Sequence, residues 1–451
     1  MKKCLLLYLF LLAYSFTYGQ GLDIYVVTQG DPDILCLNDG LGNLQCDTLS
    51  DSGALALSVL AADFDGDGRD DILRTVFGRP SELCSGIDGG LDCNLISTDA
   101  SVTYGATAFD ADSDGDLDLA LAIGFGPNLL CINTEADTFA CAPFDDDNST
   151  TLDAVSFDAN GDGHEDVIYA NRGNGGVTQA NVVCLSDGAG LLSCTPFADD
   201  TTRSFTVAAG DFNTDGITDV VFGNGDEQLN RVCFGRGDGS FVCRLIDTSL
   251  RDTRGVAVAD FDQDGIDDIV FANSSLQVNR ICFSNGDSTF LCQDLAPNLT
   301  LNSTGTGAHD IDADGDQDII FTNFNRTPLL GLNDGEGNFT FENLGTFAGT
   351  LNDVAFFRLD RTTSTHTIHS PSGIQLFPNP TKNRVYILNK QDRRAPQQAE
   401  IYNMLGQLCQ RQYLDGGTIQ LGGLAAGAYL VRIMANDGSI IGINRILRVD
   451  H

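Results

Sequence analysis

Nine residues that begin at Asp63 could together bind one hard metal ion. The stretch is Asp63-Phe64-Asp65-Gly66-Asp67-Gly68-Arg69-Asp70-Asp71, with carboxylates at steps one, three, five and nine and a glycine at step six. Ca²⁺ prefers about six to eight oxygen ligands on a flexible loop, and the glycine permits a sharp turn. The sequence therefore predicts a calcium loop that uses Asp63, Asp65, Asp67, Asp71 and the backbone carbonyl of Arg69. Asp and Gly also form ordinary solvated turns, so one loop alone is a weak signal.

The same pattern recurs five more times, which favours calcium over solvated turns. The first aspartates of successive loops lie 47, 48, 53, 49 and 50 residues apart. A repeat of this period indicates a propeller or an array. We expect about six Ca²⁺ ions. The further predicted side-chain ligands are Asp110, Asp112, Asp114, Asp118, Asp158, Asn160, Asp162, Asp166, Asp211, Asn213, Asp215, Asp219, Asp260, Asp262, Asp264, Asp268, Asp310, Asp312, Asp314 and Asp318.

Each repeat contains four short apolar runs separated by turns, which predicts an all-β propeller blade. The chain ends predict one further blade without a calcium loop. Residues 22–48 resemble the later part of a blade, and a run near residue 355 resembles a first strand. We therefore expect a seven-bladed β-propeller whose closing blade is shared between these two segments.

Twelve cysteines form six close pairs, each separated by 9 or 10 residues with turn residues between them. This spacing predicts a β-hairpin with the two cysteines facing each other, and hence a disulfide. Zinc is the alternative, but the pairs lack the short spacing of zinc ligands and occur once per repeat. Cys409 is left over as a predicted lone thiol. The predicted disulfides are Cys36–Cys46, Cys84–Cys93, Cys131–Cys141, Cys184–Cys194, Cys233–Cys243 and Cys282–Cys292.

Residues 1–19 have the features of a secretory signal peptide, because Lys2 and Lys3 precede an apolar run of thirteen residues. No other run is long enough to form a transmembrane segment. Export places the chain in an oxidising compartment, which agrees with the disulfides. The chain has 25 basic and 63 acidic residues, and its net charge of −38 argues against nucleic acid or an anionic membrane surface as a partner.

The six loops, each followed by an apolar strand, resemble the FG-GAP/VCBS repeats of integrin-α-type calcium-binding propellers. The resemblance covers about residues 22–360, within an expected propeller domain at 20–360. It implies that the calcium loops lie on one face of the propeller. It also implies that ligands meet the opposite face, where loops join the second strand to the third and the fourth to the next first strand.

A polar linker at 361–374 separates this domain from a segment of different charge. From Ile374 to His451 there are nine basic and five acidic residues, whereas the chain before it, without Lys2 and Lys3, has 14 and 58. Alternating runs predict a small immunoglobulin-like β-sandwich at 375–451. Its motifs Phe377-Pro378-Asn379-Pro380 and Leu421-Gly422-Gly423-Leu424 resemble the C-terminal sorting domain of type IX secretion cargo. The resemblance implies the type IX machinery as a partner and the outer surface of a Gram-negative cell, or the medium, as the destination.

The sequence does not establish whether the propeller is an enzyme, although a binding or adhesion module for a glycan or extracellular protein ligand is favoured. No Ser/His/Asp arrangement or nucleophile elbow appears. A propeller-type polysaccharide lyase or glycosidase is one alternative, since two carboxylates, or Tyr104 with an arginine, leave no local motif. A structural surface protein is another. In the loops between second and third strands, amide and guanidinium groups suit hydroxyl-rich or carboxylate-bearing ligands. These candidate ligand-binding residues are Arg172, Asn230, Arg231, Asn279, Arg280, Asn325 and Arg326.

Overall fold

The computed structural model of the chain describes most of residues 22–358 and parts of the C-terminal segment. The gaps in the first part are 41, 50–53, 88–89, 97–101, 136–137, 145–149, 175–178, 199–200, 346 and 348. The described C-terminal residues are 374–377, 384–389, 396–403, 408–414, 418–421, 423–424, 427–435 and 440–448. The predicted signal peptide at 1–19 and nearly all of the predicted linker at 361–374 lie outside these residues.

The chain divides into two compact units whose main boundary lies between Leu359 and Asp360, with the short segment 87–92 grouped with the second unit. Every regular element in the described residues is a β-strand, which confirms the all-β class. In these residues no helix is long and apolar enough to cross a membrane.

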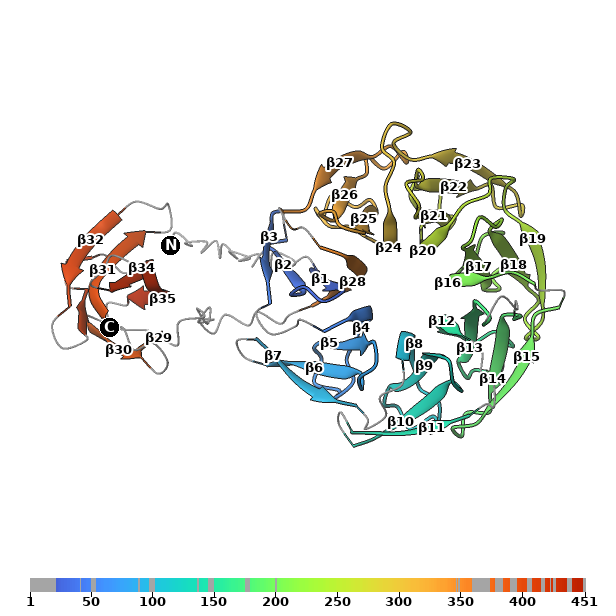
Figure 1. Cartoon of the computed structure of the whole chain (residues 1–451), viewed down its shortest axis with the longest axis horizontal. Helices are drawn as coiled ribbons and strands as arrows, with labels where there is room; N and C mark the ends of the chain where they lie inside the picture. Colours follow the sequence, from blue (N-terminus) through green and yellow to red (C-terminus); the bar gives the residue numbers. More distant parts are fainter. Residues whose placement is uncertain are drawn as a thin grey trace, which may run out of the picture. The chain divides into compact units, whose positions relative to one another are not determined.

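Seven antiparallel four-stranded sheets make up the described part of the first unit. They are arranged around a centre, with one edge strand of each sheet innermost (Figure 1). The innermost strands are β4 (Ala56–Ala62), β8 (Val102–Phe109), β12 (Thr151–Phe157), β16 (Ser204–Gly210), β20 (Thr253–Ala259), β24 (Ser303–His309) and β28 (Leu351–Phe357).

The second strand of each sheet is the most deeply buried element. These strands are β1 (Asp23–Thr28), β5 (Asp71–Val76), β9 (Asp118–Gly124), β13 (Asp166–Asn171), β17 (Asp219–Asn224), β21 (Asp268–Asn273) and β25 (Asp318–Asn323). Their apolar side chains fill cores between neighbouring sheets. In one such core, Val220 and Phe222 on β17 pack with Ile168 on β13. Burial between two sheets explains why these strands are apolar without alternation.

The two outer strands of each sheet form the hairpins. The third strands are β2 (Ile34–Asn38), β6 (Glu82–Ile87), β10 (Leu129–Glu135), β14 (Val182–Ser186), β18 (Arg231–Gly235), β22 (Arg280–Ser284) and β26 (Leu329–Leu332). The fourth are β3 (Leu44–Thr48), β7 (Gly90–Leu95), β11 (Thr138–Pro143), β15 (Leu192–Pro196), β19 (Phe241–Leu245), β23 (Phe290–Asp294) and β27 (Thr340–Asn343). All six predicted disulfides are confirmed, and each joins a third strand to a fourth. In the β26–β27 hairpin, Gly331 and Phe341 occupy the paired positions instead.

The first sheet takes its innermost strand from the far end of the unit. β28 pairs antiparallel with β1, from Asp23 opposite Phe357 to Thr28 opposite Leu351. On its other side β28 contacts the next sheet, where Ser58 and the Val59 N–H donate hydrogen bonds to Asp353 at 2.7 and 3.2 Å. The two ends of this unit are therefore joined by backbone pairing.

The second unit contains two sheets that share one core. One sheet has the order β29 (Ile374–Phe377), β30 (Arg384–Asn389), β33 (Thr418–Gln420). The other has the order β32 (Leu408–Tyr413), β31 (Pro396–Asn403), β34 (Gly427–Ala435), β35 (Ile440–Arg448). Val385 and Ile419 from the first sheet pack with Ile401 and Val431 from the second. Cys409 is exposed and forms no disulfide.

Candidate functional site

The six predicted calcium loops join innermost strands to second strands and share one backbone conformation. Step six is a glycine with positive φ in every loop, from Gly68 to Gly315. Step four also has a positive φ in every loop, although only Gly66 and Gly161 are glycines there. Ser113, Thr214, Gln263 and Ala313 adopt this left-handed conformation at an energetic cost. The same strained backbone conformation in all six loops indicates that the loops have the same role.

Hydrogen bonds inside each loop aim its carboxylates inward. In the loop that begins at Asp110, the Gly115 N–H donates to Asp110 Oδ2 at 3.1 Å. The step-nine carboxylate of Asp118 accepts from the Ala111 N–H at 2.8 Å and from the Asn133 N–H, at the end of the hairpin's third strand, at 2.7 Å. The step-nine residue therefore has a structural role as well, because it ties the loop to its own hairpin.

Carboxylate oxygens at steps one, three and nine converge in the four loops that have aspartate at all three steps. Within each set the oxygens lie within 4.8 Å of one another. Several residues of these sets also have a carboxylate oxygen that is buried without a hydrogen-bond partner, namely Oδ1 of Asp63, Asp112, Asp310 and Asp312. Asp211 Oδ1, in a fifth loop, is buried in the same way. Buried acceptors of this kind are costly unless a cation or a donor satisfies them. The arrangement fits an oxygen-ligated divalent cation.

The remaining predicted ligands are placed differently. The step-five carboxylates do not belong to these sets, and each uses one oxygen to accept the step-seven N–H, as Asp114 does from Asp116 at 3.0 Å. Asn160 and Asn213 bring an amide oxygen to step three, where it accepts the step-five N–H at 2.8 and 2.9 Å.

Burial raises the pKa of the step-nine carboxyls. The pKa is about 6 for Asp118 and Asp318 and about 7 for Asp219 and Asp268, and other carboxylates of the same loop add to the rise. Each of these carboxyls is held inside the protein beside like charges, which disfavours its ionised form.

The loops are also fastened to neighbouring sheets. Asn133 Nδ2 donates to the carbonyl of Phe64 in the preceding sheet's loop at 3.0 Å, and Asn333 Nδ2 donates to that of Phe261 at 2.8 Å. Asn38 Nδ2 likewise donates to the backbone carbonyl of Ile311 at 2.7 Å. Ordering a loop therefore also orders the junction between two sheets.

A cavity of about 470 Å³ lies at the opposite end of the innermost strands, and all seven sheets line it. Each innermost strand carries a β-bulge there, since its register with the second strand shifts by one residue. Bulges re-aim side chains and are frequent beside functional sites. The extra residue of each bulge lines the cavity; these are Leu57, Tyr104, Leu152, Phe205, Arg254, Thr304 and Asn352.

One side of the cavity is aromatic and cationic. The guanidinium groups of Arg172 and Arg254 lie over the ring of Phe205, at 4.9 and 3.7 Å from its centroid. Arg254 is paired with Asp252 at 2.9 Å. Burial raises the pKa of the nearby Tyr104, and the positive charge of Arg172 partly offsets this rise. Gly124 and Gly225 make room for the rings, because a Cβ there would collide with Tyr104 and Phe205 respectively.

Two half-buried aspartates, Asp153 and Asp353, lie one residue further along their strands. Asp153 Oδ2 accepts from the Val207 N–H at 3.1 Å, and Asp353 Oδ2 accepts from Ser58 and Val59. Each aspartate thus joins one innermost strand to another. Burial raises the pKa of both carboxyls, that of Asp153 to about 7.

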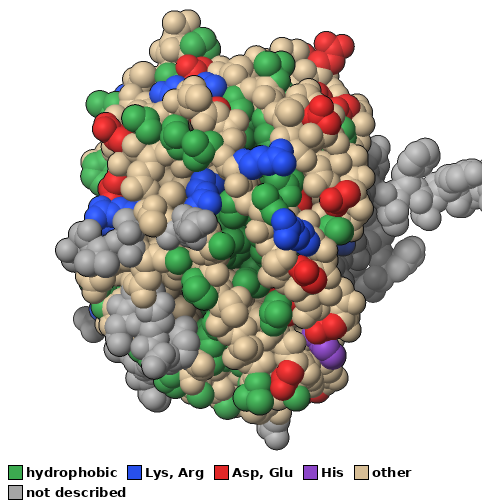
Figure 2. Space-filling model, turned by 90° about the vertical axis from the view of Figure 1, so that its right-hand side faces the viewer, with side chains coloured by type: hydrophobic (Ala, Val, Ile, Leu, Met, Phe, Trp, Pro, Cys, Tyr) green, Lys and Arg blue, Asp and Glu red, His purple; other side chains and the backbone are tan. Residues whose placement is uncertain are grey.

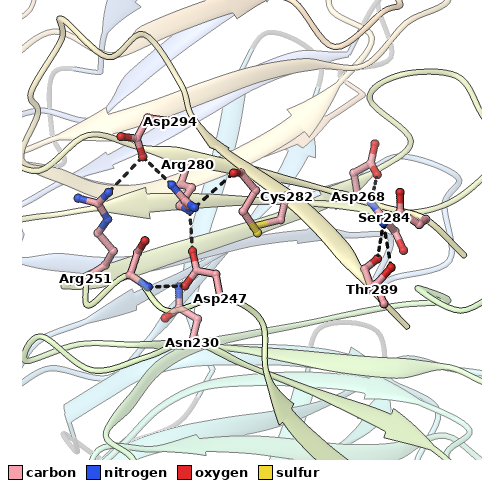
Figure 3. Close-up of a disulfide and its surroundings, with 12 residues drawn as sticks. Asn230, Asp247, Arg251, Asp268, Arg280, Cys282, Ser284, Thr289 and Asp294 are labelled. Carbon is pink, nitrogen blue, oxygen red and sulfur yellow. Dashed lines mark hydrogen bonds and ion pairs between the residues drawn. A yellow bond between two sulfur atoms is a disulfide. The ribbon is translucent and has the colours of Figure 1, made fainter. Parts of the chain in front are cut away.

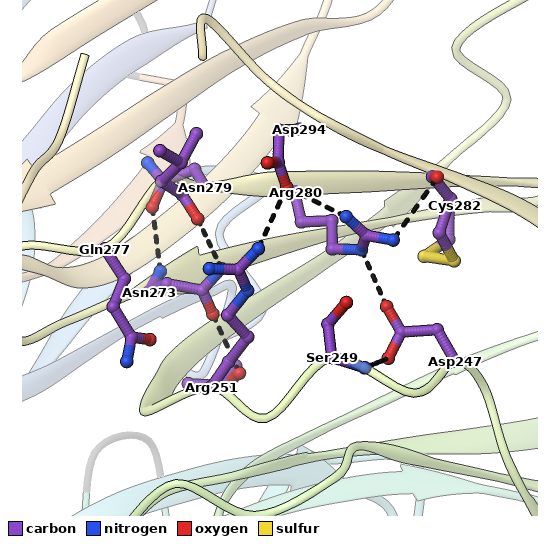
Figure 4. A network of polar contacts seen from close by, with 12 residues as sticks. Asp247, Ser249, Arg251, Asn273, Gln277, Asn279, Arg280, Cys282 and Asp294 are labelled. Carbon is purple, nitrogen blue, oxygen red and sulfur yellow. Dashed lines mark hydrogen bonds and ion pairs between the residues drawn. A yellow bond between two sulfur atoms is a disulfide. The ribbon is translucent and has the colours of Figure 1, made fainter. Parts of the chain in front are cut away.

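The predicted ligand-binding residues separate into two groups in the structure. Arg172 lines the cavity, whereas Asn230 and Asn279 are buried between sheets. Asn279 Oδ1 accepts the Asn273 N–H at 2.8 Å (Figure 4). Asn279 Nδ2 donates to Ser303 of the next sheet at 3.0 Å. Asn230 makes the equivalent bonds with Asn224 and Thr253. These amides hold neighbouring sheets together.

Arg280 also has structural partners. It pairs with Asp247 at 2.7 Å and Asp294 at 2.8 Å, next to the Cys282–Cys292 disulfide, and Arg251 reaches the same Asp294 (Figure 3). Arg231, Asn325 and Arg326 do not line the cavity, and the last two are exposed on a loop. Of the seven bulged residues, the sequence singles out only Tyr104, as a possible lyase residue. The other six were missed because a bulge depends on register between strands, which no local pattern reveals.

The side of the molecule in Figure 2 carries no continuous basic patch among its described residues. Basic side chains there are separated by hydrophobic, uncharged and acidic ones.

Two family models match the chain. The FG-GAP-like repeat matches residues 158–222 and 211–271, and the secretion system C-terminal sorting domain matches 375–445. The chain therefore contains FG-GAP-like repeats within residues 158–271. It carries a type IX sorting domain, which indicates secretion or export to the cell surface.

One solved structure shows the same kind of fold. The periplasmic gluconolactonase PpgL of Pseudomonas aeruginosa is similar with a TM-score of 0.54 and 11% identity over 75% of this chain and 99% of that one. Sqt1 of Saccharomyces cerevisiae is similar with a TM-score of 0.47 and 11% sequence identity, over 96% of this chain and 97% of that one. At such identities the likeness concerns the fold alone. No curated protein matches the chain in sequence.

Proposed function

We propose that this protein is an exported, calcium-binding, seven-bladed β-propeller that binds an extracellular ligand in its central cavity. The observation that carries the proposal is the cavity itself, to which every sheet contributes a bulged residue beside the guanidinium of Arg172. Seven β-bulges that each direct a side chain into one cavity are expected of a ligand-binding site and not of a purely structural scaffold.

The propeller closes through the sheet that unites β28 with β1, which makes the seven sheets seven blades. Its support is the pairing of Leu351–Phe357 with Asp23–Thr28 and the bonds from Asp353 to the next blade. The C-terminal unit, an immunoglobulin-like sandwich at 375–451, directs export through the type IX machinery. By analogy with such cargo it is then removed, and the propeller is attached to the surface or released.

Calcium binds the six loops through carboxylates and amide oxygens at steps one, three, five and nine. The buried, unpartnered oxygens of Asp63, Asp112, Asp211, Asp310 and Asp312 support this assignment. Extracellular sites have dissociation constants of about 10⁻⁴–10⁻³ M. At about 1 mM free calcium each site then contributes about 0.4–1.4 kcal/mol, and six sites a few kcal/mol.

Thermal unfolding in calcium and in excess EGTA tests the metal assignment. We expect a marked fall in melting temperature without calcium, and no recovery when Mg²⁺ replaces it, because Mg²⁺ demands a tighter octahedral site. Identical melting curves in the two buffers would contradict calcium binding.

A binding screen of the mature protein against glycans and extracellular matrix proteins tests the ligand site. Saturable binding that Asn352→Ala or Tyr104→Phe weakens supports the cavity. Both residues are bulged lining residues, and the exposed Arg326→Gln serves as the control. Absence of saturable binding would favour a structural surface protein.

A polysaccharide lyase is the second candidate, and the proximity of Tyr104 to Arg172 in the cavity is the observation that favours it. Elimination from a uronate needs a group to remove or donate a proton and a cation to neutralise the carboxylate. Appearance of unsaturated products, measured by ultraviolet absorbance, would establish the activity. Its loss in Tyr104→Phe would assign it to this pair.

A further inference from the structure

We propose that the central cavity selects a carboxylate-bearing sugar, a uronic acid unit of an acidic polysaccharide, and that Arg172 binds its carboxylate. This inference rests on the proposed binding function and adds the chemical class of the ligand. The inference depends on two observations: which charged side chains at the cavity already have an ion-pair partner, and which polar and apolar groups line the rest of the cavity.

The guanidinium of Arg172 is the cavity's uncommitted charge. Arg254 contacts Asp252 through both carboxylate oxygens, at 2.9 and 3.1 Å. Among the described residues, Arg172 contacts the Phe205 ring and forms no ion pair with a carboxylate, in a protein whose net charge is −38. A guanidinium presents parallel donors that match a planar carboxylate. An anionic group on the ligand would therefore find its partner here.

The position of Arg172 is set before a ligand arrives. Its guanidinium lies over Phe205, and Arg254 lies over the same ring. Gly225 leaves the space that the Phe205 ring occupies. A guanidinium held on an aromatic ring loses less freedom when it binds, and this preorganisation favours affinity.

The other lining groups fit the hydroxyls and apolar faces of a sugar. Gln29, Thr350 and the side-chain carbonyl of Asn352 offer polar groups to a ligand. Thr304 Oγ1 and Asn352 Nδ2 already donate to the carbonyls of Leu351 and Ala56, respectively. Leu57 and Leu152 add apolar surface between them. Asp153 and Asp353 also line the cavity, and in their ionised form they disfavour a second anionic group beside them, which argues against phosphate-rich ligands. A peptide carboxylate shares the anionic group but would leave most of these polar groups unpaired.

Calorimetric titration of the mature protein at fixed free calcium tests the inference. The probes are trimers of galacturonic, glucuronic and mannuronic acid, their methyl esters, and a peptide that ends in a free carboxylate. We expect at least one acidic trimer to bind about tenfold or more tightly than its ester, as a hydrogen bond to a charged group implies. Arg172→Gln should abolish that difference, whereas Arg326→Gln, on an exposed loop outside the cavity, should preserve it.

Each other outcome overturns the inference in a distinguishable way. Equal affinity for acid and ester, or an unchanged preference in a folded Arg172→Gln protein, removes the role of Arg172 but leaves the cavity as a binding site. Binding of the peptide and of no uronate replaces the ligand class. If no probe binds and the broader screen finds no ligand sensitive to Asn352→Ala, the proposed binding function fails as well.

Discussion

At the scale of single residues, one buried ion pair joins two neighbouring sheets. Arg74, on β5, is 4% exposed and pairs with Asp33 of the neighbouring sheet at 2.8 Å. Tyr25 OH donates to the same carboxylate at 3.1 Å, and Arg74 also contacts Glu82 at 2.7 Å. Burial raises the pKa of Asp33 even though Arg74 favours its ionised form. The carboxylate thus depends on its cation.

Arg74→Met should destabilise the propeller by about 3–5 kcal/mol, because it leaves Asp33 buried without its partner. The matched control is Arg203→Met, whose partner Asp226 is 2.7 Å away but whose side chains are 27% and 32% exposed. That change should cost about 1 kcal/mol or less. Urea unfolding at constant calcium measures both. Equal shifts of the midpoint would show that the inner pair has no special role.

Asp153 should make stability fall as pH rises from about 4 to about 7. Its pKa is about 7 in the folded protein and near 3.8 when exposed, so the folded state retains a proton that the unfolded state releases between these values. The stabilisation is complete below about pH 4 and is lost as pH rises through about 7.

Unfolding free energies measured from pH 4 to 8 in saturating calcium test this expectation. Asp153→Asn cannot titrate, so its profile should be flatter than that of the parent across this range. The slope of unfolding free energy against pH is the decisive quantity. The asparagine in the variant would have one acceptor oxygen fewer for the Val207 N–H, so the substitution also lowers stability at every pH. Parallel profiles would assign the pH dependence to other groups.

At the scale of elements, the calcium loop is a repeated backbone unit. Its left-handed residues at steps four and six recur around the propeller. So do its bonds to the hairpin of its own sheet and to the hairpin of the next sheet. A second repeated unit lies at the opposite end. There an asparagine before the third strand bonds both its own sheet and a Ser or Thr of the next, as Asn181 does with Asn171 and Ser204.

Two substitutions at step four should have opposite effects. Gly66 has φ 73°, and nothing lies within 4 Å of an added Cβ, so Gly66→Ala should cost about 1 kcal/mol through backbone strain alone. Ala313→Gly relieves a residue at φ 60° and should stabilise its loop by up to about 1 kcal/mol. Melting temperatures in saturating calcium would show this. A shift of the same sign in both proteins would contradict the shared conformation.

At the scale of the whole molecule, we expect the propeller to require the strand near residue 355 and to fold without the C-terminal unit. A protein ending at residue 373 keeps β28 and should fold, bind calcium and remain in the periplasm of a type IX-competent host. A protein ending at residue 350 lacks β28 and leaves β1 unpaired on one side, so it should be unstable or aggregate. Circular dichroism and cell fractionation test these outcomes.

Residues 375–451 appended to a periplasmic reporter should send that reporter out of the cell. If the protein ending at residue 373 still reaches the surface, the C-terminal unit is not its export signal. If that protein cannot fold in an oxidising compartment, the two units depend on each other.

The sequence by itself determined the features that are written in local spacing. The aspartates of each loop are at most eight residues apart, and the hairpin cysteines are 9 or 10 apart. Short-range geometry therefore fixes the loop's shape and the disulfide partners without knowledge of the fold. The sorting-type motifs of 375–451 are local in the same sense.

Only the tertiary structure decided which polar loop residues face a ligand. Asn230, Asn279 and Arg280 look like exposed loop residues in the sequence, but Thr253, Ser303 and Asp247 on neighbouring sheets occupy their bonding groups. The cavity is assembled from seven bulges that are distributed over about 300 residues. Such a site depends on register and on the arrangement of sheets, because packing between distant segments sets which side chains are buried and which remain free.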